Sequence, residues 1–180
     1  MNLDMRLVYS KFRRTFLLDT AGHNMQDMQP VVSVESLPTD ELIQILHAHW
    51  LFCTAVTPLG QVYALEASKL FVPGITVFGA RIDGELVGVG AMRRLDAQHA
   101  ELKSMHTLKM FRGLGIGKSI VSYIEDYGRS LGINQFSLET GTNEAFAPAR
   151  ELYKSLGYID SGAFGDYVLS DFNTCMTKFL

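Results

Sequence analysis

The segment Arg112-Gly113-Leu114-Gly115-Ile116-Gly117-Lys118-Ser119 decides how this chain folds, because a strand-like apolar run ends there and an amphipathic helix begins without a gap. Its three alternating glycines allow the backbone to point successive N–H groups inward. The first turn of the following helix adds unpaired N–H groups and the positive end of the helix dipole. Arg112 and Lys118 add positive charge on either side. The segment therefore predicts an anion-binding turn, and its expected ligand is a phosphate or pyrophosphate on a small cofactor.

Three known phosphate-binding patterns can be compared with this turn by their spacing. The dinucleotide pattern G-x-G-x-x-G fails, because the positions for its third glycine hold Lys118 and Ile120. The triphosphate pattern G-x-x-x-x-G-K-[ST] matches Gly117-Lys118-Ser119 but lacks its first glycine, since Arg112 stands there. A third pattern, [RQ]-x-x-G-x-[GA], fits completely at Arg112, Gly115 and Gly117. A phosphate-loop nucleotide-binding protein stays open as an alternative.

Length and composition describe one globular domain. The chain has 180 residues, of which 47% are hydrophobic and 19% are charged, as in ordinary folded proteins. The net charge of −3 argues against a nucleic-acid-binding surface, which needs clustered Lys and Arg. Cys53 and Cys175 form no C-x-x-C motif, and no apolar run reaches the ~18 residues of a membrane-spanning helix. We therefore expect a cytoplasmic protein that binds neither nucleic acid nor membrane.

Residues 1–30 differ from the rest of the chain and are interpreted as an N-terminal extension. Asp4 and Asp19 interrupt their apolar patches, and residues 22–30 are polar and turn-like, so a targeting peptide is not expected. Two alternatives stay open, which are a poorly ordered arm and a helix that packs on a partner subunit. Residues 31–180 are then the folded domain.

The periodicity of the remaining chain predicts a mixed α+β fold. Thr39 precedes acidic residues and apolar positions at helical spacing, which favours a helix that runs toward Cys53. Asp83-Gly84 joins two β-rich runs and predicts a hairpin, and Gly132 ends the helix after the glycine turn. A sheet of about six or seven strands with helices on both faces results. The expected strands are 31–34, 75–82, 85–95, 100–108, 133–140, 158–161 and 174–180, and the expected helices are 39–53, 62–71, 116–131 and 148–156.

Several separated motifs resemble the GNAT superfamily of acyl-CoA N-acyltransferases over residues 31–180. Besides the glycine turn, they include the strand end Ser137-Leu138-Glu139-Thr140-Gly141 and the pattern Ala149-x-x-Leu152-Tyr153-x-x-x-Gly157-Tyr158. The runs Phe146-Ala147-Pro148-Ala149-Arg150 and Gly165-Asp166-Tyr167 are similar to a bacterial branch of small-molecule N-acetyltransferases of the YsnE type. The resemblance implies a GNAT-like, mostly antiparallel sheet that is splayed at the cofactor site. It also implies an enzyme that moves an acetyl group from acetyl-CoA to the amine of a small molecule or amino acid.

The resemblance also implies where acetyl-CoA binds. Two neighbouring strands, which end near Thr107 and Glu139, would separate and receive the cofactor between them. The backbone of Met105, His106 and Thr107 would bind the pantetheine arm as an added strand would. The amides of Arg112, Gly113, Leu114, Gly115, Ile116, Gly117 and Lys118 would bind the pyrophosphate.

Acetyl transfer to an amine needs a base for the amine proton and an acid for the departing thiolate. Glu101 is the first candidate for the base, because the resemblance places the base of several relatives at this strand position. Simple alternation puts it on one face with Lys103, Met105 and Thr107. Glu139 is the alternative base, and for both glutamates an ion-paired surface role stays open. The resemblance implies that Tyr153 donates the proton to the thiolate, while a role in core packing stays open.

The remaining candidates concern the edges of the site. Relatives often have asparagine where this chain has Phe146, so Asn143 is the expected substitute for that cofactor contact. His106, Arg150 and Asp166 are candidates for the acceptor pocket, and Arg150 suits a substrate carboxylate. His47 and His49 do not face each other on a helix, so no metal site is expected. A homodimer is expected by analogy with the fold, and a non-catalytic acyl-CoA sensor stays open as an alternative function.

Overall fold

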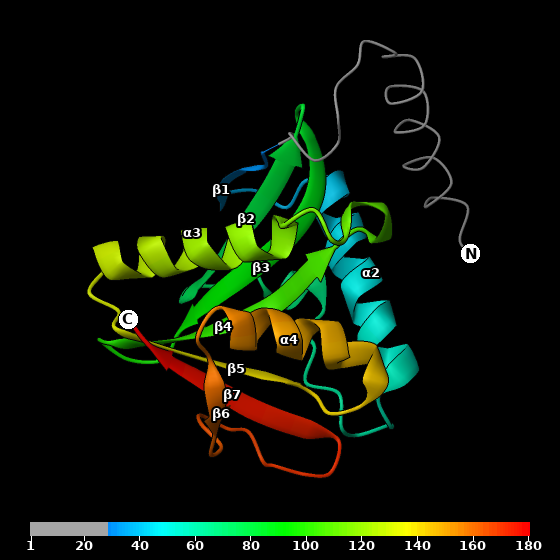
Figure 1. Ribbon diagram of the computed structural model, residues 1–180. Helices are drawn as coiled ribbons and strands as arrows, with labels where there is room; N and C mark the ends of the chain where they lie inside the picture. The colour runs from blue at the N-terminus through cyan, green and yellow to red at the C-terminus, as the bar shows by residue number, and fades with distance from the viewer. Residues whose placement is uncertain (1–28) are drawn as a thin grey trace.

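The structure, a computed structural model, describes residues 29–180 and contains one seven-stranded sheet with the strand order β1-β2-β3-β4-β5-β7-β6 (Figure 1). The predicted extension at residues 1–30 lies almost entirely outside the described residues. All neighbouring strands are antiparallel except β4 and β5, which run parallel. The strands are β1 (Val31–Glu35), β2 (Ile75–Ile82), β3 (Glu85–Arg94), β4 (His99–Thr107), β5 (Gln135–Gly141), β6 (Ile159–Ser161) and β7 (Asn173–Phe179). The predicted mixed α+β, mostly antiparallel fold is confirmed.

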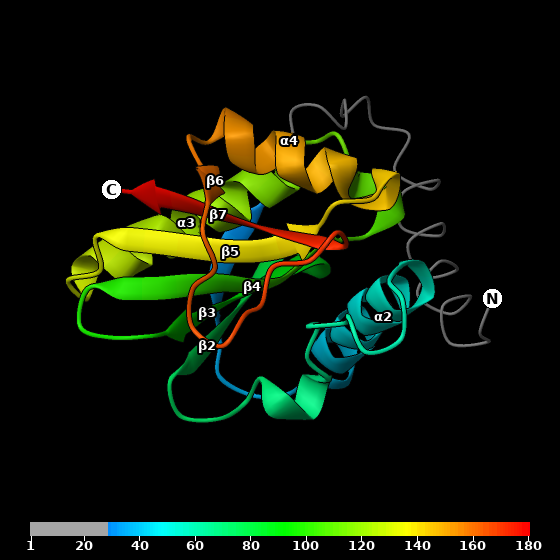
Figure 2. The same ribbon diagram turned by 90° about the horizontal axis from the view of Figure 1, so that it is seen from below.

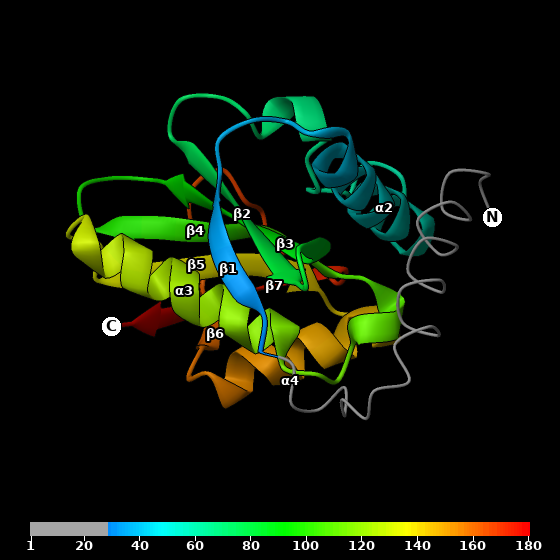
Figure 3. The ribbon, with the colours of Figure 1, turned by 90° about the horizontal axis from the view of Figure 1, so that it is seen from above.

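Helices cover both faces of this sheet. Helix α2 (Asp40–Val56) lies on one face, and α3 (Ile116–Ser130) and α4 (Ala147–Ser155) lie on the other (Figures 2 and 3). Residues 29–180 also contain the short 3₁₀ turns η2 (Ala67–Lys69), η3 (Lys109–Phe111) and η4 (Glu144–Phe146). None of the helices in this part of the chain is long and apolar enough to cross a membrane.

Local sequence accounts for most of these boundaries. The Thr39 hydroxyl accepts a hydrogen bond from the Leu42 amide and caps α2 at its N-terminus. Asp83 and Gly84 both have positive φ, as the tight turn between β2 and β3 requires. Gly132, with φ of 84°, follows α3. Leu131, the last residue of the expected helix 116–131, lies one residue beyond the end of α3 and is 43% exposed.

One expected helix is absent. Residues 62–71 contain only the 3₁₀ turn η2, and residues 61–66 have no regular structure. This segment crosses the site instead, where the ring of Tyr63 packs against the ring of Tyr167 with 4.9 Å between their centroids. The Ser170 hydroxyl also donates a hydrogen bond to Gln61. Contacts with a segment a hundred residues away thus decide the conformation, and the local apolar spacing does not.

The core between α3 and the sheet is closely packed. On α3, the side chains of Ile116, Ile120 and Ile124 are almost fully buried. Phe136 of β5 is fully buried beneath the C-terminal half of α3. Gly128 of α3 has no room for a side chain, because a Cβ there would lie 2.5 Å from the Phe136 ring. This contact sets how closely α3 approaches β5.

We expect Gly128→Ala to lower the free energy of unfolding by about 1–2 kcal/mol in urea denaturation. Overpacking against Phe136 exceeds the gain of about 1 kcal/mol in helix propensity. Gly162→Ala is the matched control, since no atom lies within 4 Å of its Cβ position and its φ is outside the left-handed region. The control is expected to change stability by less than about 0.5 kcal/mol. An unchanged free energy for Gly128→Ala would show that the Phe136 ring moves aside without cost.

Candidate active site

The site begins where β4 and β5 separate. Their parallel pairing covers only residues 99–102 and 135–138, and its last pair is Leu102 with Leu138. Beyond that pair, residues 103–107 of β4 do not pair with residues 139–141 of β5. The edge of β4 that faces this gap is therefore free to pair with an extended ligand. The predicted splay between two neighbouring strands is confirmed.

A β-bulge lies in β4 at the same place. Val89 pairs with His106 but Ala91 pairs with Lys103, so Gly90 faces two residues, Ser104 and Met105. Ser104 has a φ of 51°, a conformation that is rare for a residue with a side chain. Its hydroxyl is buried and has no hydrogen-bond partner in the described structure.

The bulge corrects the expected faces of β4. Glu101 and Lys103 lie on the α2 side of the sheet, but Met105 contacts the α3 side, since its Sδ lies 2.6 Å from a Cβ built on Gly90. Thr107 likewise approaches Gly117 of α3. His106 points to the α2 side, where its ring lies 5.6 Å from that of His49. The prediction that Glu101, Lys103, Met105 and Thr107 share one face is therefore wrong, because simple alternation fails across a bulge.

The glycine turn lies at the carboxyl end of β4. Gly113 and Gly115 have φ values of 82° and 78°, and a Cβ on either residue would contact nothing within 4 Å. Gly115 is the N-cap of α3, so the first amides of this helix face the same open space. The Arg112 Nε donates a hydrogen bond to the Thr107 carbonyl at 3.1 Å, which fixes the guanidinium beside the turn. The turn has the geometry of an anion site at a helix N-terminus.

A cavity of about 420 Å³ connects the turn with the splay. Its walls come from β4, the glycine turn, the end of β5, α4, the second half of α2 and residues 61–65. It therefore opens on both sides of the sheet at the gap between β4 and β5. Most of the predicted site residues line it, namely Glu101, Met105, His106, Thr107, Arg112, Gly113, Gly115, Ile116, Gly117, Lys118, Glu139 and Tyr153.

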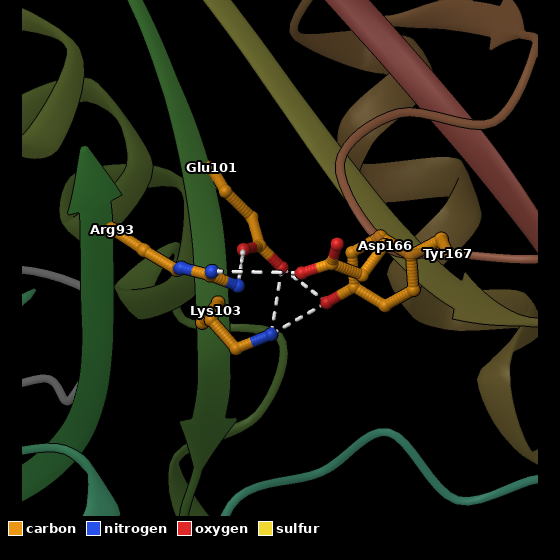
Figure 4. A network of polar contacts seen from close by, with 5 residues as sticks. All are labelled: Arg93, Glu101, Lys103, Asp166 and Tyr167. Carbon is orange, nitrogen blue, oxygen red and sulfur yellow. Dashed lines mark hydrogen bonds and ion pairs between the residues drawn. The ribbon is translucent and has the colours of Figure 1, made fainter. Parts of the chain in front are cut away.

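Glu101 is the centre of a polar network on the α2 side (Figure 4). Its side chain is 1% exposed, and Oε1 accepts hydrogen bonds from Lys103 Nζ at 2.7 Å and from the Tyr167 hydroxyl. Lys103 Nζ also donates to the Tyr167 hydroxyl at 2.5 Å. Arg93 lies 3.8 Å from the other oxygen of Glu101 and 3.9 Å from the exposed Asp166. The charge of Glu101 is thus compensated by two cations.

Glu139 lies on the same face but in a different environment. Glu101 pairs with Ser137, so alternation along β5 brings Glu139 to the α2 side as well. Glu139 forms no ion pair within residues 29–180. Burial raises its pKa to about 7, although the charge of Lys103 and a hydrogen bond with Asn173 both act to lower this pKa. Glu139 can therefore gain and lose a proton near neutral pH.

Tyr153 reaches the gap from the other side of the sheet. It belongs to α4, whose Leu152 lies against Gly117 of α3. Burial raises the pKa of its hydroxyl well above the usual range, and Cys53 and Glu139 add to that effect. Tyr153 therefore keeps its proton at neutral pH, at a place within electrostatic reach of Glu139. The gap between β4 and β5 has a titrating carboxylate on one side and a protonated phenol on the other.

The two histidines of the cavity are neutral near pH 7. Burial lowers the pKa of His49 to about 4 and that of His106 to about 3. His49 also contacts Cys53 Sγ at 3.7 Å from Nε2. Burial raises the pKa of Cys53 to about 12, so its thiol stays protonated. Within the described residues no group of three or more His, Cys, Asp or Glu side chains is arranged to hold a metal ion.

Several predicted residues lie outside the cavity. Leu114 and Asn143 do not line it, and the Asn143 side chain donates to the Val56 carbonyl and accepts from the Ala145 amide. Arg150 donates to the carbonyls of Gly141 and Asn143, and Asp166 is 95% exposed, so the expectation that they line the acceptor pocket is wrong. The guanidinium of Arg150 instead fixes the chain where β5 ends.

Comparison with known families agrees with this arrangement. The sequence profile of the acetyltransferase (GNAT) family matches residues 41–158, which include the splay, the glycine turn and Tyr153. The chain belongs to the GNAT acetyltransferase family. As in that family, the activity is acetyl-CoA-dependent acetyl transfer, and the phosphate-loop nucleotide-binding alternative is rejected.

Individual relatives cover most of the chain. It is 33% identical to the uncharacterized N-acetyltransferase YsnE of Bacillus subtilis (strain 168) over 149 residues, which are 83% of this chain and 99% of YsnE. A Klebsiella pneumoniae structure assigned to the acyl-CoA N-acyltransferases aligns with a TM-score of 0.70 at 23% identity, over 87% of this chain and 99% of that chain. A GNAT acetyltransferase of Elizabethkingia anophelis with acetyl-CoA bound aligns with a TM-score of 0.62 at 12% identity, over 84% and 98% of the two chains.

The residues of this chain fit acetyl-CoA as the acetyl donor. The open backbone of Gly113 and Gly115 and the first amides of α3 offer donors to a pyrophosphate, with Arg112 and Lys118 nearby. The unpaired edge of β4 matches an extended amide-containing arm. The unpartnered Ser104 hydroxyl lines the same cavity and is a further group for which a bound ligand supplies a partner.

Four residues in or beside the site could not be predicted from the sequence. Ser104 had no local signal, because serine is not a typical left-handed residue. Arg93, Tyr63 and Tyr167 reach the site through pairing and loop contacts that link distant segments. Tyr167 was part of a noted motif, but nothing in the sequence indicated that it contacts Glu101.

We expect Gly115→Glu to weaken acetyl-CoA binding in isothermal titration calorimetry by about tenfold or more relative to Gly115→Gln. Both variants carry the same left-handed strain of roughly 1–2 kcal/mol, but only glutamate places a negative charge over the amides that would bind the pyrophosphate. Gly115→Gln is thus the matched control for size and strain. Equal affinities for the two variants would show that the phosphates do not bind at this turn.

Proposed function

We propose that the protein acetylates the primary amine of a small molecule by direct attack on the thioester of acetyl-CoA. The observation that carries the proposal is that Glu139 and Tyr153 both line the cavity at the gap between β4 and β5, from opposite sides of the sheet. A base that titrates near pH 7 faces the gap from the α2 side, and a phenol that keeps its proton faces it from the α4 side. These are the two proton-transfer groups that the reaction needs.

The proposed reaction follows from this placement. The amine enters from the α2 side as an ammonium ion and transfers a proton to Glu139, which leaves a neutral nitrogen nucleophile. The nitrogen then forms a bond to the thioester carbon, and the carbon–sulfur bond breaks. Tyr153 donates its proton to the departing thiolate. Glu139 releases the first proton to solvent and then accepts the second proton from the nitrogen, and this proton passes through solvent to Tyr153, so both residues return to their starting states and one proton is released per amide formed.

The structure favours Glu139 over Glu101 as the base. Glu101 is held by Lys103, Arg93 and Tyr167, so its Oε1 already accepts two hydrogen bonds and its carboxylate is paired with two cations. We assign Glu101 a positioning role, in which it orients Lys103 and Tyr167 along the wall of the cavity. Glu139 interacts with Lys103 only at longer range and forms no ion pair among the described residues, and it is the stronger candidate.

The proposal includes a cytoplasmic location and a homodimer. Cys53 and Cys175 are both buried and unpaired, which suits a reducing compartment. Ile159 of the edge strand β6 and Phe179 of β7 are 67% and 71% exposed, so this end of the sheet offers an apolar surface to a second copy.

The pH dependence of kcat/KM tests Glu139. We expect kcat/KM to rise as the pH increases through about 7, because the base must lose its proton to accept one from the amine. Glu139→Gln should lower kcat/KM by ~10²-fold and remove the inflection near pH 7, leaving only the rise that reflects ionisation of the amine itself.

Glu101→Gln is the comparison variant for this measurement. It should retain the inflection near pH 7 even if its turnover is low. An inflection that disappears in Glu101→Gln and persists in Glu139→Gln would show that Glu101, and not Glu139, is the base. Acetyl-CoA binding without CoA release from any amine would instead support a non-catalytic sensor.

Tyr153→Phe tests the acid. We expect kcat to fall by ~10²-fold with little change in acetyl-CoA affinity, because only the proton for the thiolate is lost. Tyr158→Phe is the control, since this neighbouring buried hydroxyl donates to Glu125 and does not line the cavity. The control should lower stability and leave kcat within about a factor of three. Full activity in Tyr153→Phe would leave this residue only a packing role.

A further inference from the structure

The part of the cavity on the α2 side determines which amine can enter, and we call it the acceptor compartment. Its walls include Phe52, Tyr63, Lys103, His106, Glu139 and Tyr167. The glycine turn with Arg112 and Lys118 forms the opposite end of the cavity, where the resemblance places the pyrophosphate. The charges that an acceptor meets are therefore those of the acceptor compartment alone.

Lys103 carries the positive charge in the acceptor compartment, and that charge is compensated. Nζ donates to Glu101 at 2.7 Å and to the Tyr167 hydroxyl at 2.5 Å, and it lies 5.2 Å from the centre of the Tyr167 ring. The side chain is only 8% exposed. Arg93, the next cation, contacts the far oxygen of Glu101 and does not line the cavity. An entering carboxylate would thus lose its water without gaining an uncompensated cation.

The other titratable groups do not change this balance. His49 and His106 are uncharged near neutral pH, because burial lowers the pKa of both. The thiol of Cys53 and the phenol of Tyr167 keep their protons, since burial raises both pKa values. Glu139 is the one carboxylate among the described cavity residues that has no ion-pair partner. In the acceptor compartment, Glu139 is therefore the one place where a positively charged group of the acceptor can be neutralised.

The remaining walls are uncharged and mostly apolar or aromatic, with Thr57 and Gln61 as polar residues. Phe52 packs edge-to-face on Phe146, and Tyr63 packs in the same way on Tyr167, with centroid distances of 5.3 and 4.9 Å. Val62 and Leu65 continue the wall formed by residues 61–65. Such walls favour an apolar body and stabilise an aromatic ring through edge-to-face contacts. They offer no further unpaired carboxylate for a second or third ammonium group of a polyamine.

We propose that the acceptor is a monoamine with an aromatic or branched apolar body and without a carboxylate. This inference rests on the acetyltransferase function proposed above. The single ammonium group binds at Glu139, and the apolar body lies against Tyr63, Phe52 and Tyr167. Amino acids with a free carboxylate and polyamines are excluded by the compensated charge of Lys103 and by the apolar walls.

A matched set of amines tests the proposal. CoA release is measured for phenethylamine, phenylalaninamide, phenylalanine and spermidine, after calorimetry has established that acetyl-CoA binds. We expect kcat/KM to be about tenfold or more higher for phenethylamine and phenylalaninamide than for phenylalanine and spermidine. Phenylalaninamide separates the effect of the carboxylate from that of substitution at the α-carbon.

Glu101→Gln provides a second, internal test. Removing the negative charge leaves Lys103 uncompensated, so an entering carboxylate gains a partner. The ratio of kcat/KM for phenylalanine to that for phenethylamine should therefore increase by about tenfold, whatever the absolute turnover. Glu151→Gln is the control, because this glutamate is 75% exposed on α4 and should leave the ratio unchanged.

The results of these experiments distinguish failure of the acceptor assignment from failure of the proposed acetyltransferase function. A preference of the wild-type protein for phenylalanine or spermidine, or acetyl-CoA binding with no CoA release from either aromatic monoamine, would overturn the acceptor assignment. Release of CoA with any amine in the set would still support the acetyltransferase. Failure of acetyl-CoA to bind would overturn the proposed function and the acceptor assignment with it. An unchanged ratio in Glu101→Gln would show that Lys103 does not govern exclusion of the carboxylate.

Discussion

The separation of β4 from β5 after Leu102 and Leu138 is the constraint on which the rest of this structure depends. Parallel pairing would otherwise continue and close the sheet through the centre of the molecule. The bulge at Ser104, with its left-handed backbone, turns β4 away at this point, and such strain costs roughly 1–3 kcal/mol. The result is a gap in the sheet that can be approached from both faces. A ligand in this gap can therefore contact side chains from both faces of the sheet.

Charge balance within this gap separates two carboxylates that lie on the same face. Glu101 has two cations and a phenol beside it, whereas Glu139 has no ion-pair partner in the described chain. Lys103 is ion-paired with Glu101 and acts on Glu139 only electrostatically, without an ion pair. Environments that differ in this way allow two identical groups to have different tasks. On this basis we propose that Glu101 holds the wall of the cavity and that Glu139 takes part in proton transfer.

The two halves of the cavity are built from the chain in different ways. The donor half comes from one continuous segment, which is the end of β4, the glycine turn and the start of α3, and it uses mainly backbone groups. The acceptor half combines α2, residues 61–65 and the β6–β7 loop, and it uses side chains. Figure 2 shows this loop passing on the same side of the sheet as α2. Substitutions in these segments can thus alter the acceptor without disturbing the donor site.

The sequence by itself determined the features that depend on neighbouring residues. The glycine turn, the Asp83-Gly84 hairpin, the Thr39 cap and the end of α3 at Gly132 follow from local backbone preferences, and the motifs around them identified the family. Only the tertiary structure decided that Ser104 forms a bulge, that residues 61–66 are not helical, that Arg150 binds backbone carbonyls and that Glu101 is compensated. Each of these depends on partners that are distant along the chain, and pairing register, burial and charge compensation are set only when those partners meet.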